Sequence, residues 1–281
     1  MAWISFVLNA VALLCAGCVG WDTRRVDGRR LMGYLFFAGL VMCVRAFLYA
    51  HPEHEQVFLS LSDNYLYFAA WEAPVATFMV FALLARLGQQ RTRQVAVFLM
   101  ILLSPLFLWE SFAPCVEPNY AMAARFDDDG VCRQSTDYSC GPAAAVMMAQ
   151  HAGREISEGE MAQLCLLKAH RGVTALELCR GLNIALRPEQ HRARIRRVAP
   201  AELGGVRRPF LAELVRGGQA EHCVMVVEVA ADSLILADPA RGRYATTRDG
   251  FVKQWTGIVI TLESLAPATG QVAWLGGPEA H

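Results

Sequence analysis

The stretch that decides the fold of this 281-residue chain is residues 133–151, which read RQSTDYSCGPAAAVMMAQH. The apolar run predicts a helix over 140–151, because Pro142 stands near its start, where a missing N–H does no harm, and Gly153 follows its end. Cys140 therefore opens a helix. Unpaired backbone N–H groups and the helix dipole favour a thiolate there, which makes Cys140 a candidate nucleophile.

The chain after this helix carries further helix patterns and then strand patterns. Two capping boxes, Ser157–Glu160 and Thr174–Glu177, predict one helix that continues over 161–168 and another that ends near Gly181. Strand patterns follow over 210–215, 222–229, 233–237 and 257–262. The second and third of these runs form a predicted hairpin. Helices first and strands later indicate an α+β domain.

A nucleophilic cysteine needs a base, and His222 is the best candidate because it begins a predicted strand that would aim its imidazole. Asp238 ends the next strand of the hairpin. Because the start of one hairpin strand lies opposite the end of the next, Asp238 is expected beside His222 and would orient it. Gln134, six residues before Cys140, is a candidate to stabilise an oxyanion together with the Cys140 backbone N–H.

Each of these residues also has an ordinary structural interpretation, which the residues alone leave open. A lone cysteine at a helix start is usually a small buried side chain. A histidine on an apolar strand is usually a core residue, and Asp-Pro after a strand is usually a turn.

The other cysteines indicate no chemistry. Cys15 and Cys18 lie inside an apolar run without the context of a redox motif, and no His/Cys set has convincing zinc spacing, so no metal site is expected. Cys165, Cys179 and Cys223 fall on apolar positions and are expected in the core.

Three segments together resemble one known family. Residues 133–143, the run HCVMVVEV over 222–229 and the run LILADP over 234–239 are similar, in order and spacing, to the bacteriocin-processing, double-glycine-leader cysteine peptidases. The likeness extends to residues 172–174, Gly181, Gly242 and residues 251–257. It covers roughly residues 133–262, about half of the chain.

The resemblance implies a papain-like fold in which Cys140 is the nucleophile, His222 the general base and acid, Asp238 the orienting residue and Gln134 part of the oxyanion hole. It implies cleavage of a peptide bond through a thioester, often after a small-residue pair such as Gly-Gly, with no cofactor. Many members are the cytoplasmic N-terminal domain of an ATP-driven peptide exporter. This chain has no Gly-x-x-x-x-Gly-Lys-Ser/Thr phosphate loop, so neither a nucleotide nor ATP-driven export is expected.

Two other functions stay open on the same residues. The domain would act as a peptide-binding module without cleavage if the thiol is unreactive. It would act as an acyl or amide transferase if the acyl group passes from the cysteine to an amine instead of to water.

The first 112 residues concentrate the apolar side chains. Over the whole chain 54% of residues are hydrophobic and 19% are charged, whereas soluble domains have about 25% charged residues. Four segments are long enough to cross a bilayer: residues 3–21, 31–50, 65–85 and 95–112. They lack the polar face of a soluble helix. The sequence therefore predicts an N-terminal α-helical membrane bundle of four transmembrane helices over residues 1–112, followed by the papain-like domain.

Arginines in the short loops predict the orientation of this bundle. Loop 22–30 carries four Arg and loop 86–93 carries three, whereas loop 51–64 carries no Lys or Arg. The Arg-rich loops belong in the cytoplasm, so the peptidase domain is expected on the periplasmic face of a bacterial inner membrane. Expected partners are a protein or peptide substrate, membrane lipid and other membrane proteins. The zero net charge argues against a dedicated nucleic-acid binder.

Two charged residues fall inside predicted spans and need partners there. Arg45 and Glu72 lie at similar depth in adjacent spans and are expected to pair between helices; the alternative is a relay within the membrane. Farther along the chain, seven Arg between 187 and 208 indicate a solvated face, with contact to lipid phosphates or to an acidic substrate segment as alternatives.

The remaining segments complete the expected organisation. Residues 113–132 are expected to be a linker, which a disulfide between Cys115 and Cys132 would pin to the domain; the alternative is two free thiols. The peptidase domain is expected over 133–264, and residues 265–281 are expected to be a tail.

Overall fold

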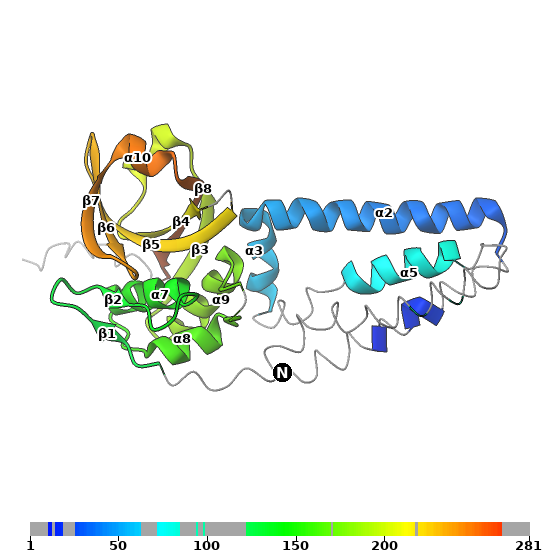
Figure 1. Cartoon of the computed structure of the whole chain (residues 1–281), viewed down its shortest axis with the longest axis horizontal. Helices are drawn as coiled ribbons and strands as arrows, with labels where there is room; N and C mark the ends of the chain where they lie inside the picture. The colour runs from blue at the N-terminus through cyan, green and yellow to red at the C-terminus, as the bar shows by residue number, and fades with distance from the viewer. Residues whose placement is uncertain are drawn as a thin grey trace, which may run out of the picture.

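The computed structural model describes residues 11–12, 15–18, 26–62, 72–84, 94, 98, 122–169, 171–216 and 219–265. Figure 1 shows an elongated helical part and, at one end of it, a domain of strands and helices. The predicted tail therefore lies outside the described residues except for Leu265.

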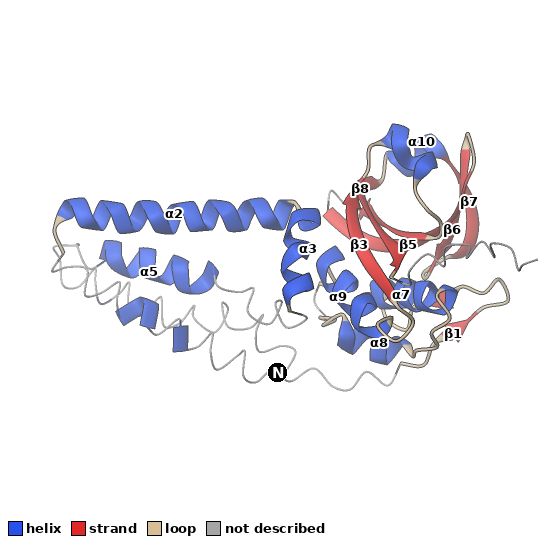
Figure 2. Cartoon of the chain, turned by 180° about the vertical axis from the view of Figure 1, so that it is seen from behind, coloured by secondary structure: helices blue, strands red, loops and turns tan. Residues whose placement is uncertain are grey.

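A six-stranded antiparallel sheet with the order β3-β8-β4-β5-β6-β7 forms the centre of the C-terminal domain. The strands are β3 (His191–Arg197), β4 (Phe210–Arg216), β5 (Gln219–Val229), β6 (Ser233–Asp238), β7 (Gly242–Thr247) and β8 (Trp255–Ser264). Helices α7 (Cys140–His151), α8 (Glu158–Leu164) and α9 (Ala175–Ala185) gather on one side of this sheet, and α10 (Arg248–Val252) lies on the other (Figures 1 and 2). The α+β prediction is confirmed.

The predicted hairpin is present as β5 and β6. Its register pairs Met225 with Ala237 and Val226 with Leu236, and the turn is closed by a bond from Ala230 N to Ser233 O of 2.8 Å. This register sets the end of β6 against the middle of β5, close to His222. His222 does not begin the strand as predicted, because β5 already starts at Gln219, where it pairs with β4.

Both capping boxes are also present, at Ser157–Glu160 and at Thr174–Glu177. The helices that begin at these capping boxes end at other residues than the sequence predicts. Helix α8 ends at Leu164 rather than near Lys168, and α9 continues past Gly181 to Ala185. Gly181 does not end the helix: a Cβ there would lie 2.3 Å from Cys165 Sγ, so glycine lets the two segments pack closely.

Sequence patterns missed both edge strands of the sheet. The basic run that forms β3 buries only Ala193 and Ile195, and β7 buries little beyond Gly242. Edge strands need no apolar alternation, because one side of each faces solvent or another element. Residues 113–132, expected to be a linker, contain β1 (Arg125–Phe126) and the start of β2 (Cys132–Arg133), which pair antiparallel. A turn of 3-10 helix, Pro200–Gly205, was not expected either.

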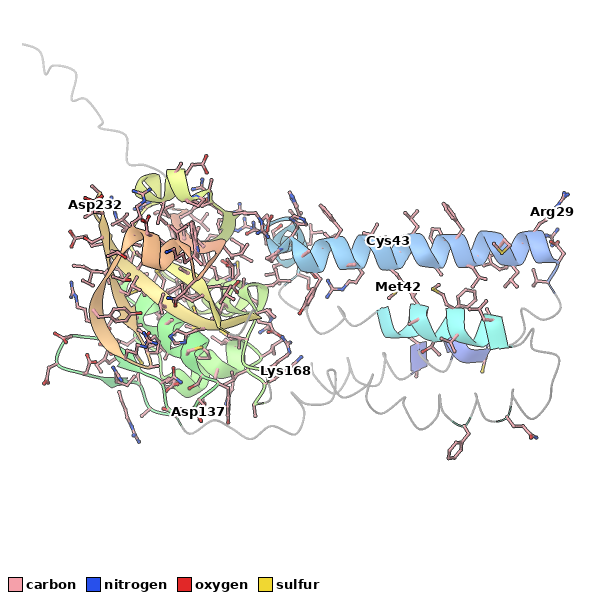
Figure 3. All side chains as sticks on the ribbon, turned by 45° about the horizontal axis from the view of Figure 1, so that its top comes forward. Arg29, Met42, Cys43, Asp137, Lys168 and Asp232 are labelled. Atoms are coloured by element: carbon pink, nitrogen blue, oxygen red, sulfur yellow. The ribbon has the colours of Figure 1, made fainter. Side chains whose placement is uncertain are left out.

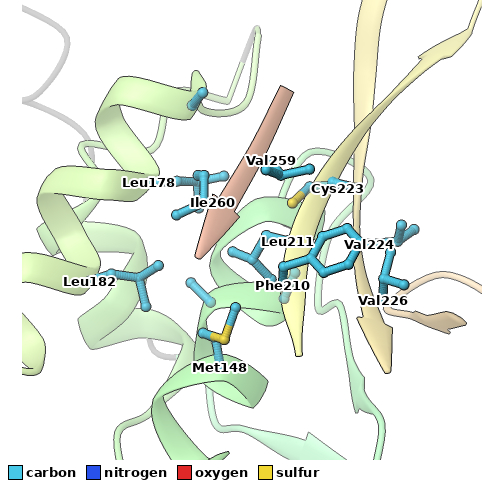
Figure 4. Packing of buried hydrophobic residues seen from close by; sticks show 14 of the residues in the cluster. Met148, Leu178, Leu182, Phe210, Leu211, Cys223, Val224, Val226, Val259 and Ile260 are labelled. Atoms are coloured by element: carbon cyan, nitrogen blue, oxygen red, sulfur yellow. The ribbon is translucent and has the colours of Figure 1, made fainter. Parts of the chain in front are cut away.

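The domain core lies between the three helices and the sheet (Figure 4). Helix α7 is its central element, since every residue from Gly141 to Ala149 is buried. Met148 of α7, Leu182 of α9 and Phe210 of β4 are fully enclosed. Cys165, Cys179 and Cys223 also belong to this core, as the sequence predicts.

Cys132 agrees with the free-thiol alternative instead of the disulfide. It is a free thiol with no exposed surface, and burial, the largest cause, raises its pKa to about 12. The proposed partner Cys115 lies outside the described residues. A buried neutral thiol is a packing residue here rather than an anchor for the linker.

Helix α2 (Gly28–Ala50) contains the predicted second span. Its 23 residues make it about 35 Å long, which is enough to cross a bilayer. Among the described residues it is the one helix that is long and apolar enough to do so. Large apolar side chains stand exposed along it, among them Met32, Phe36 and Tyr49, and it lies beside α5 (Glu72–Leu84), as Figure 3 shows with Met42 between them. Most of the first and fourth predicted spans, and the start of the third, lie outside the described residues.

Residues 51–64 hold a helix, α3 (Pro52–Leu61), where a loop was expected. This helix covers the free edge of β3. The Gln56 side chain donates to Ile195 O (2.7 Å) and accepts from Ile195 N (2.8 Å), so it bonds the edge as a neighbouring strand would. Leu59 joins the core of the C-terminal domain. The helical part is therefore packed onto the sheet domain.

Charged groups reinforce this contact. Arg197 donates to Glu53 Oε1 and to Ala50 O, each at 2.9 Å, so part of the basic cluster between 187 and 208 is an internal docking surface instead of a solvated face. Arg45 pairs with Glu55 at 2.9 Å, a partner that the sequence did not suggest. The side chain of Glu72, its predicted partner, is not among those described.

We expect Gly181→Ala to lower the free energy of unfolding by about 1–3 kcal/mol, because the new methyl group would overlap the Cys165 sulfur in a closed core. Adding Cys165→Ala should restore most of the loss by removing the sulfur. Chemical unfolding of the full chain in detergent measures both. Gly204→Ala is the matched control, since a Cβ there meets nothing within 4 Å. Equal effects of Gly181→Ala and Gly204→Ala would contradict the packing argument.

Candidate active site

Cys140 is the first residue of α7 and is half-buried. The preceding Ser139 makes no side-chain cap, because its hydroxyl is engaged by Thr136, accepting from Thr136 N (3.0 Å) and donating to Thr136 O (3.2 Å). The Ser139 side chain therefore does not accept from the N–H groups of the first turn. Those groups and the helix dipole favour an anion at the Cys140 sulfur.

Gly141 lets a neighbouring loop approach the first turn of α7 closely. A Cβ at this position would lie 2.3 Å from Val173 Cγ2, so the loop after Gly172 packs directly against the first turn of α7. Gly172 itself has φ +73°, a conformation that glycine adopts without strain, and its place beside Tyr138 O leaves only 3.2 Å for a Cβ. The glycines noted in the sequence therefore shape the walls around Cys140.

His222 and Asp238 are brought together by the β5–β6 hairpin. His222 Nε2 lies 2.8 Å from Asp238 Oδ1, and the two side chains are 5% and 1% exposed. The carboxylate is held by its own turn, since Oδ1 also accepts from Ala240 N (2.8 Å) and from Arg241 N (3.3 Å). The rigid strand pair and the turn fix the orientation of the imidazole.

The protonation states of this pair follow from their contacts. Burial lowers the pKa of His222, but hydrogen bonds to Asp238 and to the Cys140 side chain, together with electrostatic attraction to these groups, outweigh it and raise that pKa to about 9. Burial raises the pKa of Asp238, and the hydrogen bond and charge of His222 outweigh it, so that pKa is lowered overall. At neutral pH an imidazolium lies between a carboxylate and the sulfur of Cys140.

Gln134 follows β2 and bonds both to the turn after Asp238 and to the loop before Cys140. Its backbone N–H donates to Pro239 O at 3.1 Å, which ties it to the turn after Asp238. Its side-chain Nε2 donates to Thr136 O at 2.7 Å, in the loop that leads to Cys140. The amide has a second N–H, which leaves one donor for another acceptor.

Two side chains that position this loop were missed by sequence reasoning. Glu158 is fully buried, and it accepts from Ser135 N (3.0 Å) and from Ser135 Oγ (2.5 Å). Arg133 donates to Ala240 O and lies 3.6 Å from Asp127, which links β2 to the same turn as Gln134. The only signal for Glu158 was its place in a helix-start pattern, which hides its inward-facing role.

Comparisons with known proteins find a family model and relatives that match the C-terminal domain. Residues 129–266 match the sequence model of the peptidase C39 family. An uncharacterized protein of Methanothermobacter marburgensis is 35% identical over 144 residues, which cover 51% of this chain and 95% of that protein. The lactococcin-G-processing and transport ATP-binding protein LagD of Lactococcus lactis is 35% identical over 52 residues, 18% of this chain and 7% of that protein.

Among solved structures, the peptidase domain of Streptococcus ComA is similar with a TM-score of 0.42 and 23% identity, covering 47% of this chain and 96% of that one. A double glycine motif protease from an AMS/PCAT transporter, solved with its leader peptide, is similar with a TM-score of 0.42 and 20% identity, covering 52% and 97%. Through its C-terminal domain, the chain belongs to the peptidase C39 family.

Proposed function

We propose that this protein is a membrane-anchored cysteine endopeptidase that cleaves a peptide bond in a secreted or membrane-associated protein. The observation that carries the proposal is the chain of contacts from Asp238 through His222 to Cys140 at the start of α7. It contains a nucleophile, a base and an orienting carboxylate in the order that acyl transfer needs.

The geometry supports a two-step mechanism. The Cys140 thiolate attacks the carbonyl carbon of the scissile bond, and the developing oxyanion accepts hydrogen bonds from the Cys140 N–H and the Gln134 amide. The His222 imidazolium gives its proton to the leaving amine, and the C–N bond breaks to leave a thioester. Neutral His222 then takes a proton from water, whose oxygen attacks the thioester. The carboxylic acid product and the Cys140 sulfur separate, and the imidazolium is restored.

The names of two similar proteins support a substrate class. One is described as processing lactococcin G and the other as a double glycine motif protease, and we propose a similar preference here for cleavage after a small-residue pair of the Gly-Gly type. A protein or peptide substrate would reach Cys140 at the half-buried mouth of α7.

We propose that the four apolar segments anchor the domain in a bacterial inner membrane, with the peptidase on the periplasmic face. The exposed apolar surface of α2 supports contact with lipid. The packing of α3 against β3 supports placing residues 51–64 and the peptidase on the same side, as the arginine distribution predicts. Because α3 bonds to the edge of the sheet, the active site would be held at a constant height above the membrane.

A thiol-directed probe tests whether the domain is an enzyme or only binds peptides. An ordinary thiol is only a few per cent ionised at neutral pH, so a Cys140 thiolate paired with His222 should alkylate about 30-fold faster than an ordinary cysteine. Peptide mapping of the labelled full chain measures the rate at Cys140. His222→Gln is the control and should slow the labelling to the ordinary rate. Slow labelling of Cys140 in the parent chain would favour the binding module.

The pKa of His222 predicts a loss of activity and stability at alkaline pH. The folded pKa of about 9 exceeds the ordinary value of 6.5, so the stabilisation is complete below pH 6.5 and is lost as the pH rises through 9. Cleavage should fall over the same range, because neutral His222 cannot protonate the leaving amine. Profiles of kcat/KM and of the unfolding midpoint against pH measure both.

Asp238→Asn should move the alkaline limb of these profiles to lower pH, since it removes the contact that most raises the His222 pKa. His151→Ala, an exposed histidine at the other end of α7, should leave the limb in place. An unchanged limb in Asp238→Asn would reject the assignment of this limb to His222.

A further inference from the structure

The corner between α2 and α3 gathers two histidines and a glutamate away from the active site. His51 lies between the two helices, and Glu53 and His54 belong to the first turn of α3. One ligand atom of each residue lies within 4.8 Å of the others. This corner follows the last residue of α2 and lies where the helical part contacts the sheet domain (Figure 1).

The separation of these groups suits a tetrahedral metal ion. His51 Nδ1 lies 3.1 Å from Glu53 Oε1. Two ligands held about 2.0–2.1 Å from zinc at the tetrahedral angle are about 3.3 Å apart, so His51 and the Glu53 carboxylate already lie near the separation that an ion requires. The ligand atom of His54 lies within 4.8 Å of theirs and would move closer to complete the site. Phe47 packs beside both imidazoles, with ring centroids 4.6 Å from His51 and 5.8 Å from His54, and this contact restricts the rotation of the two rings.

Glu53 has an incomplete set of partners. Its Oε1 accepts from Arg197 Nε at 2.9 Å, whereas Oε2 is enclosed and meets no hydrogen-bond donor among the described residues. A buried charged oxygen without a partner is costly, and a cation would satisfy it.

We propose that His51, Glu53 and His54 bind a divalent transition-metal ion of the zinc type, with water as the remaining ligand. Two imidazoles and one carboxylate, without a thiolate, form a donor set that zinc accepts. His54 is exposed, which gives the ion a path from solvent. Because Glu53 also holds Arg197 of β3, the ion would strengthen the contact between the membrane part and the peptidase domain.

Metal titration of the full chain in detergent tests this site. The protein is purified without a polyhistidine tag and carries Cys140→Ala, so that the active-site thiol cannot bind the probe. We expect one equivalent of Zn²⁺ to bind, and Co²⁺ to give visible d–d bands without a thiolate charge-transfer band. Both His51→Ala and His54→Ala should weaken binding by at least about 10–100-fold, the loss typical even of an indirect metal contact.

Matched measurements separate this site from adventitious binding. His151→Ala removes an exposed histidine elsewhere and should bind the ion as the parent does. Zn²⁺ should raise the unfolding midpoint of the parent but not of His54→Ala, whose side chain is exposed and not needed for folding. Absence of stoichiometric binding, or binding unchanged in His51→Ala and His54→Ala, would overturn the proposal.

Discussion

Cys140→Ala will abolish cleavage while the chain still folds. We expect the rate of peptide-bond hydrolysis to fall by about 10⁴-fold or more, because the thioester cannot form and only binding and oxyanion stabilisation remain. The side chain is half-buried at the start of a helix whose buried residues are Gly141 to Ala149, so its loss leaves the packing of α7 intact. Product formation by mass spectrometry measures the effect, with thermal unfolding as the check on folding.

The same variant identifies the substrate. Expressed in its host membrane, the Cys140→Ala chain should accumulate one uncleaved protein and co-purify with it, and the mass of the product released by the parent chain locates the cleaved bond. Cys43→Ala, which removes an exposed thiol of α2 (Figure 3), is the control and should cleave normally. Turnover retained in Cys140→Ala would remove the nucleophile assignment. A product joined to an amine instead of water would indicate a transferase.

His222→Ala has the second largest expected effect, a loss of about 10³–10⁵-fold in kcat/KM. Without the imidazole, no group takes up and returns the proton during acylation and hydrolysis. The alkaline limb near pH 9 should also disappear from whatever activity remains. Asp238→Asn should cost less, about 10²–10⁴-fold, because it disturbs the orientation and charge of the imidazole without removing it.

Folding must be separated from chemistry in these variants. His222→Ala leaves the buried Asp238 carboxylate with only its backbone donors, which destabilises the hairpin. His222→Gln keeps a donor toward Asp238 and should fold like the parent while losing activity to a similar extent. A folded His222→Gln chain with normal kcat/KM would contradict the role of His222 in proton transfer.

Local patterns in the sequence were sufficient for the helix at Cys140, both capping boxes and the β5–β6 hairpin. Each depends on residues close in the chain: Pro142 near a helix start, Ser157 and Thr174 with a glutamate three residues later, and two apolar runs separated by a short turn. The hairpin alone brought His222 and Asp238 together, because its register is a local property.

The edge strands, the ends of α8 and α9, and the role of residues 51–64 were not predictable in this way. The basic run of β3 looks like a solvent-facing surface until Gln56, over a hundred residues earlier, bonds to its edge. Helix α9 continues past Gly181, where the close approach of Cys165 leaves no room for a Cβ, so this glycine serves packing rather than the helix end. Contacts between distant segments override the local preference of each segment.

The amino-acid sequence by itself determined the family, the α+β class, the apolar second span and the four residues proposed to act in peptide cleavage, since each is written in residue type, order and short spacing. Only the tertiary structure decided which partners Arg45 and Arg197 have and that α3 joins the membrane part to the sheet. It also decided that Cys132 is a buried free thiol and that Glu158 holds the Gln134 loop. These contacts link segments far apart in the chain, and their energies depend on burial and distance, which no local pattern specifies.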